Sequence, residues 1–236
     1  MINEDFITTL KTRWMTTEIN VLREYFQHNF LNNLYRLPQA NKLFFKGGTV
    51  LRIIYQSPRF SEDLDFSSLI YSYSIIEKLI EEILIQLHYQ GIEVDMSEAK
   101  PTTGGYLFVA KTNLLGKEIG LKLNFVFKKK IEGESHVIRC VFIPAYNLIA
   151  LKKQTIICEK IEALLTRAKS RDFFDLYYIL RARLGKEIVI EQRDEILKLI
   201  EKTKDGFADL KQFLPKNFWP IIKELGKNLK SELTML

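Results

Sequence analysis

Residues 44–66 of this 236-residue chain have the sequence FFKGGTVLRIIYQSPRFSEDLDF. The segment predicts a short apolar strand, a turn at Gly47 and Gly48, a helix, and a second strand that carries Asp63 and Asp65. Alternate residues of a strand point to the same face, so the two carboxylates should lie together. Two like charges held that close are costly unless a cation lies between them. Because the turn and the N–H groups of the next helix suit a phosphate, the segment predicts a site for a metal-bound nucleoside triphosphate.

The composition is that of an ordinary globular protein, with 47% hydrophobic and 27% charged residues. The net charge of +6 permits a polyanionic partner such as RNA without requiring one. Cys140, Cys158 and the three histidines form no ligand-spaced cluster, which argues against a disulfide framework and against a zinc site. The polar N-terminus differs from a signal peptide, and no apolar run reaches membrane-spanning length. We therefore expect a cytoplasmic protein that binds no membrane.

The hydrophobic periodicity predicts an α/β half followed by a helical half. Residues 5–34 have apolar side chains at near-helical spacing, which predicts one or two helices. The other elements expected before Pro144 are strands at residues 42–46, 64–66, 92–96, 106–112, 119–127 and 135–142, and helices at residues 49–56 and 75–89. Beyond Pro144 we expect helices at residues 146–168, 172–184, 191–203 and 220–233. The expected domains are an α/β domain with N-terminal helices, residues 1–143, and a helical domain, residues 144–236.

Three later segments carry polar side chains in patterns that suggest chemistry. The expected strand at residues 119–127 alternates strictly, with apolar residues on one face and Asn124 among the polar residues of the other. The expected helix beyond Pro144 presents Lys160 on one face. The next helix has Asp172 and Asp175 three residues apart, so that both lie on the same side.

Four motifs, in this order, resemble the AbiEii/AbiGii family of nucleotidyltransferase toxins. They are KGGT at residues 46–49, RFSEDLDF at 59–66, EKIEALLTR at 159–167 and RDFFDL at 171–176. The family comprises the toxin halves of type IV toxin–antitoxin and phage abortive-infection systems and is similar to the mycobacterial MenT toxins. The resemblance covers roughly residues 42–180. It implies an α+β fold: a polymerase-β-like nucleotidyltransferase core, with a mixed sheet flanked by helices, and a C-terminal helical domain.

The resemblance also implies an activity and a set of partners. Members transfer a nucleotide from a nucleoside triphosphate, in some cases onto the 3′ end of tRNA, and are paired with a cognate antitoxin. At the matching positions of this chain, the residues that would bind the triphosphate are Gly47, Gly48, Thr49 and Ser61.

The remaining matching positions would carry the catalytic groups. Asp63 and Asp65 would coordinate Mg²⁺ or Mn²⁺, which stabilises in-line displacement at the α-phosphorus. Lys160 would neutralise phosphate charge from the helical half. Asp172 or Asp175 would assist metal placement or activate the incoming hydroxyl. The resemblance therefore implies an active site in a cleft between the two domains.

Asn124 departs from the pattern of polymerase-β-like enzymes, which carry a third carboxylate on the corresponding strand. An amide carbonyl can ligate a metal, but it brings no negative charge and cannot act as a general base. Three hypotheses follow. The first is a metal-dependent nucleotidyltransferase that acts on RNA, the second a nucleotide-binding pseudoenzyme, and the third a basic RNA-binding or partner-binding protein that has kept only the fold.

Several of these charged residues have a purely structural alternative. Arg171 would form an ion pair with one of the two later aspartates and lock two helices together. Arg59 would pair with Glu62 rather than contact a phosphate. The basic run at residues 128–130 would be a solvated strand end rather than an RNA contact.

Overall fold

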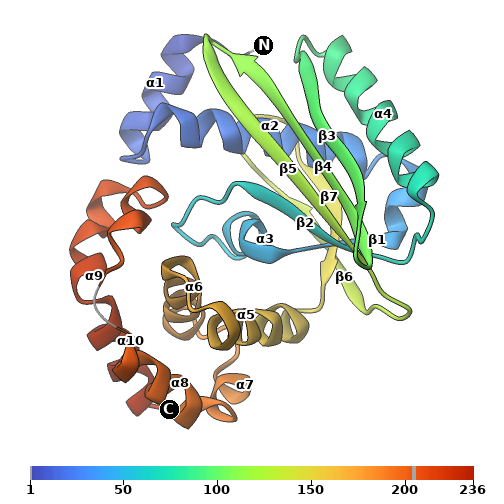
Figure 1. Cartoon of the computed structure of the whole chain (residues 1–236). Coiled ribbons are helices and arrows are strands. Elements are labelled where there is room, and N and C mark those ends of the chain that lie inside the picture. The colour runs from blue at the N-terminus through green and yellow to red at the C-terminus, as the bar shows by residue number, and fades with distance from the viewer. Residues whose placement is uncertain (1, 204–205) are drawn as a thin grey trace. The chain divides into compact units, whose positions relative to one another are not determined.

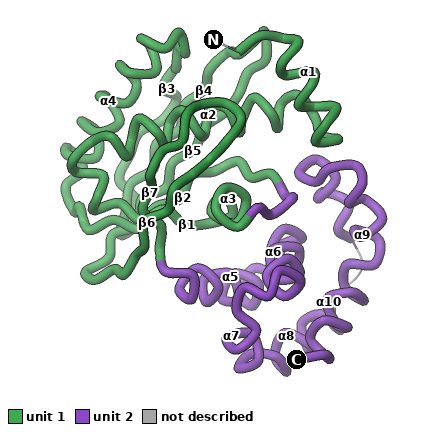
Figure 2. The backbone as a smooth tube through the Cα atoms, turned by 180° about the vertical axis from the view of Figure 1, so that it is seen from behind, with its two compact units in different colours: residues 1–55, 60–151 green, residues 56–59, 152–236 purple. Residues whose placement is uncertain are grey.

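The computed structural model describes residues 2–203 and 206–236 and shows a mixed sheet with helices, followed by a helical region (Figure 1). The chain forms two compact units, coloured separately in Figure 2. The first unit contains residues 1–55 and 60–151, and the second contains residues 56–59 and 152–236. A short segment before β2 thus packs with the second unit, although its neighbours along the chain belong to the first.

The first unit is built on a seven-stranded sheet with the strand order β3-β4-β5-β2-β1-β7-β6. The strands are β1 (Leu43–Lys46), β2 (Asp63–Ser68), β3 (Val94–Thr102), β4 (Gly105–Leu114), β5 (Lys117–Phe127), β6 (Gly133–Ile138) and β7 (Tyr146–Leu151). Strand β2 is parallel to β5 and antiparallel to β1. The centre of the sheet is therefore assembled from strands that are distant in the sequence.

The helices of the first unit are α1 (Glu4–Arg13), α2 (Glu18–Leu34), the 3₁₀ turn η1 (Pro38–Lys42), α3 (Gly47–Ile53) and α4 (Tyr73–Tyr89). Helix α1 begins where the Asn3 side chain accepts the Phe6 N–H at 2.9 Å, and α2 where the Thr17 side chain accepts the Asn20 N–H at 3.3 Å. Helix α2 packs against α4 and against β5 and β7, so most of its side chains are buried.

Three phenylalanines form the centre of the core of this unit. Phe45, Phe66 and Phe125 are register partners on β1, β2 and β5, and their ring centroids lie 5.5 Å and 5.1 Å apart in that order. Each is at most 3% exposed. Since side chains alternate along a strand, the residues next to them point to the opposite face of the sheet, where β2 carries Asp65.

Strand β7 corrects the expectation of a helix from residue 146 onward. It pairs with β6 and, through Ala150, with Phe45 of β1. Its buried residues include Tyr146, Leu148 and Ala150, which alternate with residues that are less buried. This sequence also fits a helical pattern, and pairing with strands from elsewhere in the chain decides the outcome. The first unit consequently extends to Leu151.

The second unit is helical, as expected. Its elements are α5 (Lys153–Arg167), α6 (Ser170–Arg181), α7 (Lys186–Ile190), α8 (Arg193–Lys202), η2 (Ala208–Gln212), η3 (Lys216–Phe218), α9 (Trp219–Lys223) and α10 (Leu225–Thr234). Helix α6 packs against α5 and α10, and Phe173 lies 5.2 Å from Phe207 between ring centroids. The helix expected at residues 220–233 is two helices, separated at Glu224. Within the described ranges, no helix has both the length and the apolar character needed to span a membrane.

His28 on α2 connects this helix to β7. Its side chain is 3% exposed, and Nδ1 lies 2.8 Å from the Tyr146 hydroxyl. Burial, together with the charge of Arg52, lowers the pKa of His28 to about 4. The unfolded chain binds a proton there near pH 6.5. The neutral ring therefore contributes stability that is complete above about pH 6.5 and is lost as the pH falls towards 4.

We expect the free energy of unfolding to decrease by about 2 kcal/mol between pH 7 and pH 5 because of His28 alone. Urea unfolding at the two pH values measures this. The His28→Gln variant should lose that part of the pH dependence. The matched control is His88→Gln, because the side chain of His88 is 62% exposed, and it should behave like the wild type. Equal pH dependence in the wild type and His28→Gln would rule out this origin.

Candidate active site

The two carboxylates predicted to act together lie on one face of β2. Asp63 and Asp65 are both half-buried, whereas Leu64 between them is fully buried on the other face. In the sheet, Asp65 is aligned with Lys46 on β1 and with Asn124 on β5. The side chains of β2 and β5 alternate as expected, and the pairing of the two strands places Asn124 next to Asp65.

Gly47 gives the Asp65 carboxylate its space. Its φ angle is +83°, a conformation that side-chain-bearing residues rarely adopt. A Cβ atom at this position would overlap Oδ2 of Asp65. Gly48 follows in the first turn of α3. Gly47 is therefore required both by the turn and by the close approach of the carboxylate.

Thr49 and Gln27 hold the backbone around the carboxylates. Thr49 is fully buried, and its hydroxyl donates a hydrogen bond to the Asp63 carbonyl, which fastens α3 to the start of β2. The Ser61 and Glu62 carbonyls accept hydrogen bonds from Nε2 of Gln27 at 2.9 Å and 3.1 Å. Sequence reasoning missed Gln27, because it lies 34 residues before Ser61 and belongs to no local motif.

The amide of Asn124 is directed at Asp65. Its Nδ2 donates a hydrogen bond to Oδ1 of Asp65 at 2.8 Å. A carboxylate at this position would repel Asp65, whereas the neutral amide holds its side chain in place. With the nitrogen engaged, the carbonyl oxygen is the group that Asn124 can offer to a cation.

The donor set of this face suits a divalent cation that arrives with its substrate. Asp63 and Asp65 supply carboxylate oxygens, and Mg²⁺ is commonly held by one or two carboxylates together with substrate phosphates and water. Among residues 2–203 and 206–236, no group of three or more His, Cys, Asp or Glu side chains is arranged to hold a metal. Asp63 and Asp65 would therefore be a partial set of ligands, to which phosphate oxygens would add the rest.

Arg23 brings positive charge to the carboxylates from α2. Its guanidinium lies 3.2 Å from Glu62, and its side chain is 15% exposed. Burial lowers the pKa of Arg23, and the charges of Glu62 and Asp63 oppose that shift. The ion pair that the structure shows for Glu62 is with Arg23, and the one that it shows for Arg59 is with Asp175.

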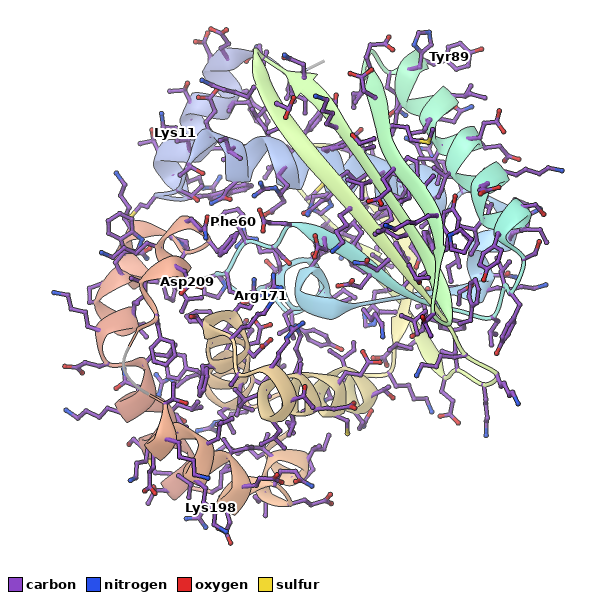
Figure 3. The ribbon with its side chains drawn as sticks, in the orientation of Figure 1. Lys11, Phe60, Tyr89, Arg171, Lys198 and Asp209 are labelled. Atoms are coloured by element: carbon purple, nitrogen blue, oxygen red, sulfur yellow. The ribbon has the colours of Figure 1, made fainter. Side chains whose placement is uncertain are left out.

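Arg52 fixes α3 against α2. Its Nε donates to Glu24 at 2.7 Å, and its guanidinium lies 4.0 Å from the centroid of the Phe60 ring. Phe60, labelled in Figure 3, is the second residue of the RFSEDLDF motif, three positions before β2 begins. These contacts hold α3 and the segment that leads into the carboxylate strand.

In the second unit, Arg59, Lys160 and Asp175 form a buried ion cluster. Arg59 binds both carboxylate oxygens of Asp175, at 2.7 Å and 2.9 Å, and Nζ of Lys160 lies 2.7 Å from the same carboxylate. None of the three side chains is more than 8% exposed. Burial raises the pKa of Asp175, but the two cations outweigh it and the pKa is lowered. The cluster carries a net charge of +1.

Asp172 joins α5 to α6. It is fully buried, and its carboxylate accepts two hydrogen bonds from Arg167, at 2.9 Å and 2.6 Å, and one from the Lys169 N–H at 3.2 Å. Between the helices, Ala168 has a left-handed φ of 46°. The ion pairs anticipated for these aspartates therefore exist, but the partners are Arg167, Arg59 and Lys160 rather than Arg171.

The predicted site residues thus fall into two sets. The first unit brings together the residues around β2 and α3, namely Gly47, Gly48, Thr49, Ser61, Asp63, Asp65 and Asn124. The second unit holds Lys160, Asp172 and Asp175. That the two sets meet in a cleft between domains stays a prediction.

Comparisons with known proteins identify the family. The family model for the nucleotidyltransferase AbiEii toxin of type IV toxin–antitoxin systems matches residues 29–232. A search of curated proteins gives no match.

Two solved structures have a similar fold. One is MenT4, a nucleotidyltransferase toxin from Mycobacterium tuberculosis, with 16% identity, a TM-score of 0.69, and coverage of 100% of this chain and 91% of that chain. The other is JHP933 from Helicobacter pylori, with 20% identity, a TM-score of 0.61, and coverage of 93% and 92%. The predicted α+β class, a nucleotidyltransferase core with a C-terminal helical region, is confirmed. Because the family model covers most of its length, this chain belongs to the AbiEii family of nucleotidyltransferase toxins of type IV toxin–antitoxin systems.

Proposed function

We propose that this nucleotidyltransferase uses Mg²⁺ or Mn²⁺ to transfer a nucleotide from a nucleoside triphosphate to RNA, with tRNA as the acceptor, and that a cognate antitoxin restrains it. The observation that carries the proposal is the pair of carboxylates, Asp63 and Asp65, next to the glycine turn at Gly47. Since both substrates are cytoplasmic, the proposal also assigns the protein to the cytoplasm.

In this reaction an RNA hydroxyl attacks the α-phosphorus of the triphosphate. The bond from that phosphorus to the bridging oxygen breaks, pyrophosphate leaves, and the hydroxyl proton passes to a base. When bound, the cation neutralises phosphate charge and lowers the pKa of the attacking hydroxyl. Asp63 and Asp65 would hold it, and Asn124 would fix Asp65 through the observed hydrogen bond.

The proposal keeps Lys160 as a phosphate-neutralising residue and Asp172 and Asp175 as supporting residues. The net positive charge of the Arg59–Lys160–Asp175 cluster supports the role of Lys160. The contacts of the two aspartates favour positioning over proton transfer, because the oxygens of each carboxylate already accept hydrogen bonds from cationic side chains.

A second candidate is a nucleotide-binding pseudoenzyme, or an RNA-binding or partner-binding protein that has kept the fold. Asn124 favours it, because the site lacks a third carboxylate and the amide is already engaged with Asp65. Such a protein would bind the metal–triphosphate complex, or RNA, without moving a nucleotide.

The first prediction of this proposal concerns the two carboxylates. Purified protein incubated with each labelled triphosphate, Mg²⁺ and total RNA should label RNA, and Asp63→Asn and Asp65→Asn should each reduce the rate by about 100-fold or more and abolish growth inhibition. The matched control is Asp95→Asn, an exposed aspartate on β3, which should leave both unchanged. Full transfer by both site variants would refute the proposal. Mg²⁺-dependent triphosphate binding without labelled RNA would instead favour the pseudoenzyme.

The second prediction separates the clash at Gly47 from backbone strain. Gly47→Ala introduces both the strain of a positive φ and an overlap with Asp65. Gly116 has a similar φ of +75°, but nothing lies within 4 Å of a Cβ there. The strain of a positive φ should cost each alanine variant about 1 kcal/mol of stability, and the overlap should make the loss larger in Gly47→Ala. Only Gly47→Ala should lose transfer activity. The same activity in the two variants would show that Asp65 needs no such space.

The third prediction tests whether Lys160 contributes to nucleotide transfer as well as to the stability of the second unit. Lys160→Met leaves Asp175 paired with Arg59, so the melting temperature should change little. Asp175→Asn leaves two buried cations without their anion and should cost about 3–5 kcal/mol of stability. Lys160→Met should nevertheless lose transfer activity. The matched control is Lys198→Met on α8, labelled in Figure 3 and exposed. Unchanged transfer by a well-folded Lys160→Met would remove Lys160 from the active site.

A further inference from the structure

Three strands of the first unit end at the same edge of the sheet (Figure 1). Strands β2 and β5 are parallel and finish there, and β1 is antiparallel to β2 and starts there. Two backbone hydrogen bonds extend the pairing past the strand ends: the Leu69 N–H donates to the Lys42 carbonyl, and the Lys128 N–H donates to the Ser68 carbonyl, both at 3.0 Å. The lysines on either side of β2 are therefore held in place by the backbone.

This edge is strongly basic. Lys42 before β1 and the run Lys128–Lys130 after β5 are all exposed. The backbone of Lys128 pairs with Ser68, the last residue of β2, and that of Lys42 pairs with Leu69, the residue after it. The Cα atoms of the two lysines are therefore separated by about two strand spacings, or about 10 Å. Four positive charges are thus gathered around the ends of three neighbouring strands.

An aromatic cluster adjoins the lysines. The centroids of the Tyr71 and Tyr73 rings lie 5.4 Å and 5.6 Å from that of Phe127, the residue before Lys128. Although they pack on Phe127, Tyr71 and Tyr73 are 52% and 39% exposed. Their remaining ring surface faces water. We refer to Tyr71, Tyr73 and Phe127, together with Lys42 and Lys128–Lys130, as the edge platform.

The chemistry of the edge platform suits single-stranded nucleic acid. Exposed aromatic rings offer surfaces on which unpaired bases stack, and neighbouring lysines neutralise the phosphates that connect those bases. The acidic residue Glu77 on α4 is also exposed, but its carboxylate already accepts a hydrogen bond from the Tyr106 hydroxyl at 2.7 Å. A double helix would present its phosphates but could not offer base faces to the tyrosines.

The edge platform is separate from the carboxylate site. Phe127 lies on the face of β5 that carries Phe125, opposite to the face of Asn124. Along β2, Asp65 lies three residues, or about 10 Å, before the last residue of the strand. A ligand on the edge platform therefore does not occupy the position of the reacting groups.

We propose that the edge platform is an exosite that binds a single-stranded segment of the RNA acceptor, with bases stacked on Tyr71 and Tyr73 and phosphates held by Lys42 and Lys128–Lys130. The inference rests on the proposed function in taking RNA as the acceptor. Binding at this surface, however, is measured independently of nucleotide transfer.

The aromatic part is tested with a short fluorescent oligouridine and fluorescence anisotropy. The double variant Tyr71→Leu/Tyr73→Leu keeps apolar side chains but removes the rings, and its dissociation constant should rise by about fivefold or more. Tyr71→Phe/Tyr73→Phe keeps the rings and should bind like the wild type. Tyr89→Leu is the matched control, because Tyr89 is 77% exposed at the other end of α4 (Figure 3). Unchanged melting temperatures show that each variant is folded.

The basic part is tested by salt dependence. Replacing Lys128, Lys129 and Lys130 by Gln should reduce the slope of log affinity against log salt concentration by about 2, since each phosphate contact contributes about 0.7 for a single strand. The charge-matched control replaces Lys11, Arg13 and Lys117 by Gln, all exposed residues of the first unit, of which Lys11 is labelled in Figure 3. The control should keep the slope of the wild type.

The outcomes distinguish failure of the exosite from failure of the proposed function. If the edge platform variants bind oligouridine as the wild type does, the exosite is wrong, whether or not the protein transfers nucleotides. If they lose binding while the wild type labels no RNA, the exosite stands and the transferase proposal fails. If both proposals hold, the variants should raise KM for RNA without changing kcat. Loss of antitoxin binding with normal RNA binding would identify the surface as a protein interface and overturn the exosite.

Discussion

The parallel pairing of β2 with β5 places Phe66 beside Phe125 on one face of the sheet and Asp65 beside Asn124 on the other. Core and candidate site are therefore set by the same ladder of backbone hydrogen bonds. A shift of one residue in the register of β2 would turn its carboxylates into the core and its phenylalanine out of it. The free-energy cost of burying unpaired charge would then far exceed any gain from the new strand pairing. The apolar stack thus fixes the geometry of the polar face, and Gly47 then makes room for the carboxylate that this register delivers.

The second unit depends on charge pairing inside a helical core. Asp175 is almost fully buried, and its ion pairs with Arg59 and Lys160 make that position tolerable. The arrangement links α5, α6 and the segment that contains Arg59. Asp172 performs a similar task on a smaller scale, because it satisfies Arg167 and the first turn of α6 at once. Acidic residues with a motif-like spacing therefore serve here to hold helices in place.

The sequence was informative where the pattern is local. The alternation of residues 119–127 predicted which face carries Asn124, and the two-residue spacing predicted that Asp63 and Asp65 share a face. It failed at β7, because six residues that fit a helix are held as a strand by β1 and β6. Gln27 and Arg23 were missed for a related reason: each acts on residues more than thirty positions away, and no spacing rule connects them. The assignment of Thr49 to the triphosphate came from its motif and stays a prediction, and the motif did not indicate that its hydroxyl also holds the Asp63 carbonyl.

The membership of residues 56–59 in the second unit has a consequence for how this protein can be divided. The chain passes from one unit to the other three times, after residues 55, 59 and 151. No single cut of the chain therefore yields two self-contained parts. A fragment ending at Leu151 would retain Arg59 without the carboxylate that neutralises it, and a fragment beginning at Lys152 would retain Asp175 and Lys160 without Arg59. The two units therefore have to be expressed and refolded as one chain. An exchange of either unit with a relative would also have to account for residues 56–59, which interrupt the first unit but pack with the second.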